Sequence, residues 1–126
     1  MSLDIVNEPW FESPFFYKML RIKKVSKNLK KIAIDMHEKG YCIVNLNLND
    51  TFINDINFDI SEALDKGNIK KNPKIYHYNK FPRIVEAWKY SKNVARLAKN
   101  SRLNKILKFL YQSKLLPFST INFIGG

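Results

Sequence analysis

Apolar residues recur at helical spacing through the first half of the chain. Between residues 17 and 39 they stand three and four positions apart by turns, which predicts one amphipathic helix ended by Gly40. Between residues 52 and 64 an apolar residue returns at every fourth position. That spacing predicts a second helix, capped by Asp50 or Thr51 and ended by the next glycine.

The region from residue 68 to 111 predicts shorter elements. Residues 68–82 are basic and rich in tyrosine but have no clear period, so we expect an irregular connection there. Residues 84–90 predict a short helix. Ser91 and Ser101 are suited to cap two further helices, each of which has its own apolar face.

Two stretches alternate with period two, which predicts β-strands. In the first, within residues 40–50, one face consists of Cys42, Val44, Leu46 and Leu48. In the second, one face consists of Phe118, Thr120, Asn122 and Ile124, and the other of Ser119, Ile121 and Phe123. An apolar strand with an unpaired edge tends to find a partner. We therefore expect the strand Phe118 to Ile124 to pair within the chain or to mediate self-association.

The composition predicts a globular protein. Hydrophobic residues make up 45% of the 126 positions, with five prolines and four glycines, and aromatic residues are dense in residues 1–17. We expect that N-terminal arm to be irregular and to pack its rings onto the body. Neither a repeat nor a low-complexity linker interrupts residues 1–126, which favours a single domain.

Targeting signals are not apparent in the sequence. Apolar runs stay well short of the roughly 18–20 residues that cross a bilayer. The first residues include acids and a proline where a signal peptide has a basic and then an apolar stretch, so we expect a cytoplasmic protein.

The net charge of +11 raises the question of an anionic partner. The cations concentrate on one face of the first predicted helix, where residues 18–31 contain no acid; they are Arg21, Lys23, Lys24, Lys27, Lys30 and Lys31. A basic helical module that binds nucleic acid or an anionic surface is therefore the alternative function. Most of the cations are lysine, whereas base-edge and phosphate recognition favours arginine, so we do not expect nucleic acid to be the partner.

Few residues are suited to catalysis. His37 and His77 are forty positions apart, and Cys42 lies in a strand-like apolar run, so these three side chains do not have the spacing of a zinc site. A phosphate-binding glycine loop and a nucleophile-elbow serine are also missing. We expect no catalytic residue and no metal ligand in this chain.

Thr120 and Asn122 are polar residues within the apolar terminal strand. They share one side of a segment that otherwise looks buried. Burying such groups without partners costs roughly 1–3 kcal/mol each. They are expected to face either a polar network or a ligand cavity.

Short motifs follow one another between residues 81 and 126. A basic residue precedes an Ala-Trp pair, and then come a V…LA turn, an L…L..LY helix and a PFSTINF..G strand. The residues concerned are Arg83, Ala87, Trp88, Val94, Leu97, Ala98, Leu103, Leu110, Tyr111, Pro117 through Phe123, and Gly126. In this order they resemble the stretch leading into the metal site in the phytanoyl-CoA dioxygenase family of iron(II)/2-oxoglutarate oxygenases. Residues 40–50 resemble an early strand of that family, and Ser119 stands where relatives often have glutamine.

The resemblance implies an α+β fold, with a mainly helical N-terminal region and the first strands of a double-stranded β-helix, or jelly roll. In the family, a His-x-Asp pair of iron ligands follows this strand and a second histidine comes much later. The sequence contains none of the three. The resemblance therefore implies that residues 1–126 are one incomplete, truncated domain, which is inactive alone.

For the parent protein, the resemblance implies oxidation of a small organic substrate with Fe(II) and 2-oxoglutarate. For this chain alone it implies no bound cofactor. Thr120 and Asn122 match the family's strand, so they are the candidates for lining the cofactor or substrate pocket.

Overall fold

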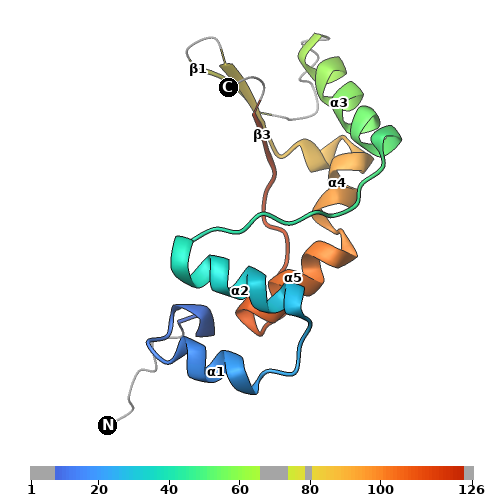
Figure 1. Cartoon of the computed structure of the whole chain (residues 1–126). Coiled ribbons are helices and arrows are strands. Elements are labelled where there is room, and N and C mark those ends of the chain that lie inside the picture. The colour runs from blue at the N-terminus through green and yellow to red at the C-terminus, as the bar shows by residue number, and fades with distance from the viewer. Residues whose placement is uncertain (1–7, 66–73, 79–80, 124–126) are drawn as a thin grey trace. The chain divides into compact units, whose positions relative to one another are not determined.

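The structure is a computed structural model that describes residues 8–65, 74–78 and 81–123. The chain divides into two compact units (Figure 1). Unit 1 comprises residues 1–46 and 102–115, and unit 2 comprises residues 47–101 and 116–126. Among the described residues, no helix has the length and apolar character needed to cross a membrane.

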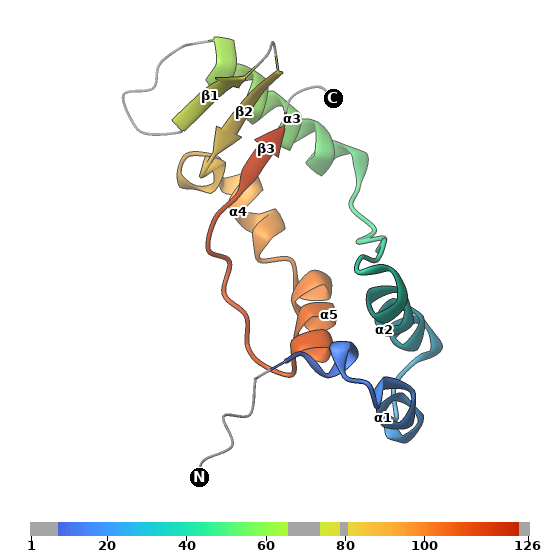
Figure 2. The same cartoon turned by 90° about the vertical axis from the view of Figure 1, so that its left-hand side faces the viewer.

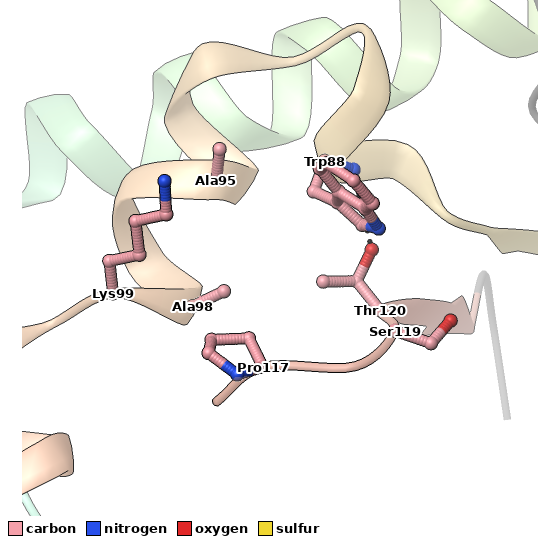
Figure 3. Close-up of a pocket in the computed structure, with 7 residues that line it drawn as sticks. All are labelled: Trp88, Ala95, Ala98, Lys99, Pro117, Ser119 and Thr120. Carbon is pink, nitrogen blue, oxygen red and sulfur yellow. Dashed lines mark hydrogen bonds between the residues drawn. The ribbon is translucent and has the colours of Figure 1, made fainter. Parts of the chain in front are cut away.

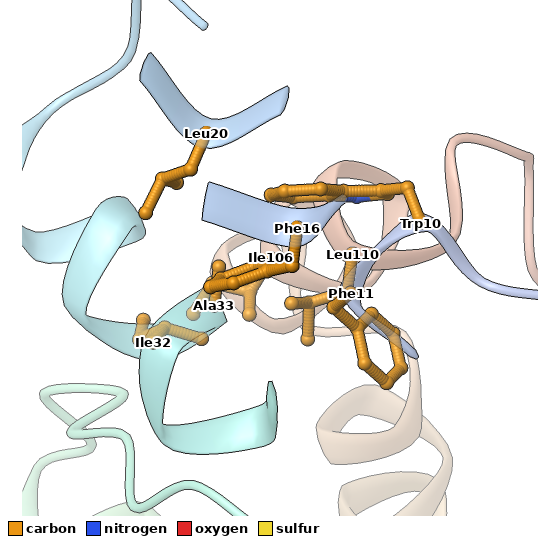
Figure 4. Close-up of a cluster of buried hydrophobic side chains, with 8 residues drawn as sticks. All are labelled: Trp10, Phe11, Phe16, Leu20, Ile32, Ala33, Ile106 and Leu110. Carbon is orange, nitrogen blue, oxygen red and sulfur yellow. The ribbon is translucent and has the colours of Figure 1, made fainter. Parts of the chain in front are cut away.

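Unit 1 is helical. It contains the 3-10 helix η1 (Trp10–Glu12), the helices α1 (Phe16–Ile22) and α2 (Lys27–Lys39), and most of α5 (Ser101–Tyr111). Figure 4 shows its core, which consists of Trp10, Phe11, Phe16, Leu20, Ile32, Ala33, Ile106 and Leu110. The Trp10 indole stacks on Phe16 and donates a hydrogen bond of 3.1 Å to the Phe109 carbonyl. The predicted packing of the aromatic arm is thus confirmed for Trp10, Phe11 and Phe16, whereas Phe15 and Tyr17 are exposed. The predicted irregular backbone is wrong where η1 and the start of α1 lie, and residues 1–7 lie outside the described residues.

The prediction of one helix over residues 17–39 is wrong, because residues 23–26 separate α1 from α2. Lys23 leaves the helix with an extended backbone, and the Ser26 Oγ accepts a hydrogen bond of 3.3 Å from the Leu29 N–H. A serine that caps a new helix competes with continuation of the old one, even where the apolar spacing runs through. The predicted end is confirmed: Gly40 is left-handed, with φ of 76°.

Residues 41–49 do not form the predicted strand. Their side chains still alternate as expected: Cys42, Val44, Leu46 and Leu48 are half-buried, and the residues between them are exposed. Cys42 and Val44 pack against the core of unit 1. The alternation therefore reports one-sided burial, whereas a strand also needs a hydrogen-bonded neighbour. Asn47, with φ of 52°, interrupts the extended backbone.

Unit 2 combines a small sheet with helices. Its elements are α3 (Asp50–Asp65), β1 (Lys74–Tyr78), β2 (Phe81–Val85), the 3-10 helix η3 (Ala87–Lys89), α4 (Lys92–Ala98) and β3 (Ile121–Phe123). The strands pair antiparallel in the order β1-β2-β3, and Figure 2 shows them side by side in front of α3. Ile60 of α3, Ile84 of β2, Ala87 and Val94 form the core of this unit.

The second predicted helix is confirmed as α3, but its cap is different. The Asn49 Oδ1 accepts a hydrogen bond of 2.7 Å from the Phe52 N–H, so the N-cap is neither Asp50 nor Thr51. Asparagine is as good an N-cap as aspartate, so composition alone did not decide between adjacent positions. The predicted glycine stop, Gly67, lies outside the described residues.

A β-hairpin replaces two predicted elements. The irregular connection over residues 68–82 is wrong where β1 and the start of β2 lie, and the helix over residues 84–90 is wrong because β2 continues to Val85. Only the 3-10 helix η3 remains of that helix. The tyrosines and isoleucines here favour strands, and pairing across the hairpin decided the conformation where periodicity was weak. Residues 66–73 and 79–80 lie outside the described residues.

The last two predicted helices are confirmed. The Ser91 Oγ caps α4 by accepting a hydrogen bond of 3.1 Å from the Val94 N–H, and it also donates to the Asp59 carboxylate of α3. The Asn93 amide donates to the same carboxylate over 3.2 Å. Helix α5 begins at Ser101 itself, so Ser101 is the first helical residue and not the predicted cap.

The closing strand is confirmed over a shorter range than predicted. β3 pairs with β2 so that Asn122 lies opposite Ile84 and Ile121 opposite Val85, while Ile124 lies outside the described residues. The described chain is thus mainly helical with one small sheet, an α+β arrangement.

Candidate functional site

A small pocket of about 100 Å³ lies in unit 2, between α4 and the segment that enters β3 (Figure 3). Helix α4 contributes small side chains, η3 contributes an indole, and the incoming segment contributes a proline ring and two hydroxyl residues. The lining residues are Trp88, Ala95, Ala98, Lys99, Pro117, Ser119 and Thr120. One of the two predicted site residues, Thr120, is therefore at the pocket.

Two hydrogen bonds hold Thr120 in place. Its carbonyl accepts the Glu86 N–H over 2.7 Å. Its Oγ1 accepts the Trp88 backbone N–H over 3.3 Å, and Figure 3 shows this second bond. Glu86 has a left-handed backbone with φ of 62°, which turns the chain sharply from β2 into η3 and aims both N–H groups at Thr120. The hydroxyl proton of Thr120 is left to donate elsewhere, because the oxygen takes part as an acceptor.

Asn122 has a different environment. It lies opposite Ile84, which is fully buried, and its Oδ1 is buried with no hydrogen-bond partner among the described residues. It does not line the pocket. The structure thus places both predicted residues on the inward side of the terminal segment, yet only Thr120 reaches the pocket.

The pocket is suited to binding rather than to proton transfer. Its walls are mostly apolar, from Ala95, Ala98, Pro117 and the Trp88 ring, and Lys99 supplies a positive charge. None of the described residues that line it is a histidine or a carboxylate. The arrangement can therefore hold a small apolar group and attract an anion.

Nothing in the sequence singled out Lys99, Ala95 or Ala98 as site residues, although Ala98 belongs to the V…LA motif quoted for the resemblance. Ala95 and Ala98 are three residues apart, so they lie on one helix face and leave room beside it. Only this small-residue spacing could have indicated a hollow. The other lining residues belong to the motifs quoted for the resemblance, although nothing in the sequence indicated that they meet.

The remaining candidates lie elsewhere. The His37 Nδ1 is 2.6 Å from the Phe11 carbonyl, and its ring stacks on Phe16 at 4.2 Å, which makes it part of the core packing of unit 1. Burial, with a smaller effect from the Asp35 charge, raises the pKa of the Cys42 thiol. A raised pKa disfavours the thiolate that catalysis by cysteine needs. His77 lies in β1.

Side chains that could bind a metal do not cluster in the part of the chain that the structure describes. It contains no group of three or more histidine, cysteine, aspartate or glutamate side chains able to hold an ion. These residues do not fit an iron site, so we derive no chemical step through iron.

Comparison with protein-family models, with curated proteins and with solved structures gives no match to this chain. The likeness to the phytanoyl-CoA dioxygenase family therefore rests on the quoted residues alone.

Proposed function

We propose that this chain supplies the N-terminal part of an iron(II)/2-oxoglutarate-dependent oxygenase of the phytanoyl-CoA dioxygenase type. In this proposal unit 2 belongs to the wall of a ligand pocket, the iron ligands are not among its residues, and the chain alone is inactive. The parent enzyme oxidises a small organic substrate with oxygen and converts 2-oxoglutarate to succinate. Its complete fold is the jelly roll, of which β3 is an early strand.

The observation that carries the proposal is the convergence of separate motifs on one pocket. The residues quoted for the resemblance come from an Ala-Trp pair, a V…LA turn and a PFSTINF strand. Five of their side chains line the same pocket: Trp88, Ala98, Pro117, Ser119 and Thr120. Ala87 and Val94, from the same motifs, are buried together in the core beneath it. A chance likeness spread over thirty positions gives no reason for this convergence.

The polar residues of the terminal strand support the same proposal. Asn122 has a buried oxygen without a partner, and such a group is tolerated where a ligand or a further element completes its hydrogen bonds. The Thr120 hydroxyl is anchored as an acceptor and can donate its proton to a ligand oxygen. Lys99 adds a cation that favours a carboxylate such as that of 2-oxoglutarate.

The test begins with the coding sequence beyond codon 126. We expect an in-frame His-x-Asp soon after it, and we expect the complete product to form succinate from 2-oxoglutarate. Thr120→Val and Asn122→Leu should each lower that rate at least tenfold, the effect of about 1.4 kcal/mol. Ile121→Val, on the opposite face of the same strand, is the matched control and should leave the rate unchanged. A stop codon at this position in every source, with no His-x-Asp encoded nearby, refutes the proposal.

We also propose that the isolated chain self-associates through the segment from Phe118 to Ile124. β3 is an edge strand, and the exposed fractions are 95% for Phe118, 53% for Ile121 and 73% for Phe123. Two such edges can pair antiparallel about a two-fold axis and cover these side chains. Sedimentation velocity should show a dimer that Ile121→Lys converts to monomer. A wild-type chain that stays monomeric at the highest soluble concentration contradicts this.

A further inference from the structure

Helix α1 in unit 1 has two apolar sides, and only one of them serves the core. Phe16 and Leu20 are buried, at 0% and 7% exposure. Phe15 and Ile22, at 69% and 79%, are among the exposed large apolar residues. A helix that only covers a core needs one apolar stripe. Phe15 and Ile22 are not among the residues that form the core of unit 1 or pack against it.

The exposed apolar residues are aligned with a cation between them. Phe15 is the N-cap residue of α1 and Ile22 is its last residue. They are seven positions apart, close to two helical turns, which favours a position on one side of the helix. Lys18 is three residues after the first and four before the second, which puts it on the same stripe. Arg21 lies beside it and is exposed as well. We call these four residues, Phe15, Lys18, Arg21 and Ile22, the α1 face.

The surroundings of the α1 face are positive. No acidic residue occurs between positions 13 and 34. Lys24, Lys27 and Lys31 are exposed in the same region. On the C-terminal side of this stretch the next acids are engaged: Asp35 pairs with Lys39 at 2.6 Å, and Glu38 accepts a hydrogen bond from the Tyr17 hydroxyl. On the N-terminal side the next acid is Glu12, which is exposed.

Lys23 is the exception among these cations. Its ammonium lies 4.4 Å from the centroid of the Trp10 ring, a cation–π contact within unit 1, and its side chain is half-buried. Within the part of the chain that the structure describes, Lys18, Arg21, Lys24 and Lys27 make no such contact with the core of unit 1, while Lys31 interacts with the Asp35 charge. The first four are therefore placed to meet a partner rather than to stabilise the unit.

We propose that the α1 face docks unit 1 on a lipid surface containing anionic headgroups. A basic helix with large apolar residues on the same side lies in the interface, burying those residues at the level of the acyl chains while its cations meet the headgroups. Each cation near such a surface contributes on the order of 1 kcal/mol of attraction, a factor of about five in binding. The proposal does not depend on the function proposed for unit 2.

Nucleic acid fits this surface less well. A phosphate backbone would pair with Lys18 and Arg21 but leave Phe15 and Ile22 in water, whereas a bilayer interface covers all four. Binding that depends on both the charge and the two apolar side chains distinguishes a lipid surface from a polyanion.

The experiment is vesicle flotation with the full chain, comparing phosphatidylcholine vesicles with vesicles that also contain phosphatidylserine. We expect binding to the second kind only, weakened by salt. Lys18→Gln with Arg21→Gln should reduce the partition coefficient about 30-fold, from two lost attractions. Phe15→Ser with Ile22→Ser should reduce it about tenfold and leave the salt dependence unchanged.

Matched controls separate the α1 face from net charge and from general stickiness. Lys105→Gln with Lys108→Gln removes the same charge from exposed positions of α5, and Phe118→Ser removes an exposed ring from unit 2. Both should change binding less than about threefold. Circular dichroism melting should show the α1-face variants to be as stable as the parent, because their side chains are exposed.

Three results overturn the proposal. One is the absence of binding to phosphatidylserine vesicles at low salt. The second is an equal loss of binding in the α5 control, which makes net charge the cause. The third is tight binding to oligonucleotides that the Phe15 and Ile22 variants leave unchanged, together with weaker binding to vesicles, which assigns the surface to nucleic acid.

Discussion

Replacing Asn122 by leucine is expected to stabilise the isolated chain. The Asn122 Oδ1 is buried without a partner, and an unsatisfied buried polar group costs roughly 1–3 kcal/mol. Leucine keeps the branched shape and removes the polar atoms, and it also suits a strand better than asparagine does. Its extra bulk opposite the fully buried Ile84 offsets part of this gain. We expect a net increase of about 1 kcal/mol in the free energy of unfolding, or about 4 °C in Tm.

The assay is denaturant unfolding followed by the fluorescence of Trp88, which lies in unit 2. Trp10 lies in unit 1, so a Trp10→Phe background makes the signal report on unit 2 alone. Tyr90→Phe is the matched control, because the Tyr90 hydroxyl is also buried without a partner in unit 2. It should be neutral or stabilising as well. A different result would be that Asn122→Leu lowers the free energy of unfolding by more than about 1 kcal/mol while Tyr90→Phe does not. Asn122 would then have a native hydrogen-bond partner, which refutes the claim that its Oδ1 is unsatisfied.

Three further predictions concern local contacts. Ser91→Ala should cost roughly 2 kcal/mol in urea unfolding, because it removes the α4 cap and the hydrogen bond to Asp59 together; a loss under about 0.5 kcal/mol would contradict this. Cys42 should be alkylated more slowly than a free thiol at pH 8 and speed up as the pH rises, because its pKa is raised; Asp35→Asn should shift that profile to lower pH, and an unshifted profile would remove Asp35 as a cause. Gly40→Ala should cost about 1 kcal/mol through left-handed backbone strain, since a Cβ there meets no neighbour, and an unchanged Tm would exclude that strain.

Local chemistry predicted the ends of elements where one residue type was decisive. Gly40 ends α2 in the left-handed conformation, and Ser91 caps α4, both as predicted. The break at Ser26 and the cap at Asn49 depended on the same chemistry, but competing signals surrounded them. Apolar spacing continued across the first, and two other capping residues followed the second.

Strands were harder to predict because a strand depends on pairing with a segment elsewhere in the sequence. Residues 41–48 alternate in burial as a strand would but do not join the sheet, whereas β1 has weak periodicity and pairs along its full length with β2. A strand's hydrogen bonds go to another segment, and the pattern of one segment does not reveal whether that segment is there.

The sequence predicted two polar residues of the candidate site but not the pocket around them. Thr120 and Asn122 stood out because polar residues interrupted an apolar strand, and the structure turns both inward. The pocket that Thr120 reaches also needs the small side chains of α4 and the turn at Glu86. Neither feature gives as strong a sequence signal as a polar residue within an apolar strand. The residues that line the pocket were therefore not predicted from the sequence.

The terminal strand β3 has a polar residue on its inner face and apolar residues on its outer face, the reverse of an ordinary edge strand. We call this reversal the inversion, and both of its parts are unfavourable. Asn122 turns a polar atom into the core of unit 2, while Ile121 and Phe123 turn apolar area toward water, at about 25 cal/mol for each Å² that could be buried. A sequence selected only for the stability of this sheet would exchange the two faces. The inversion is favourable only if a polar group meets the inner face and an apolar surface covers the outer one. For that reason Asn122→Leu should stabilise the isolated chain and impair the function proposed for it. A variant that gained stability without losing activity would show that the stability cost of Asn122 is not linked to that function.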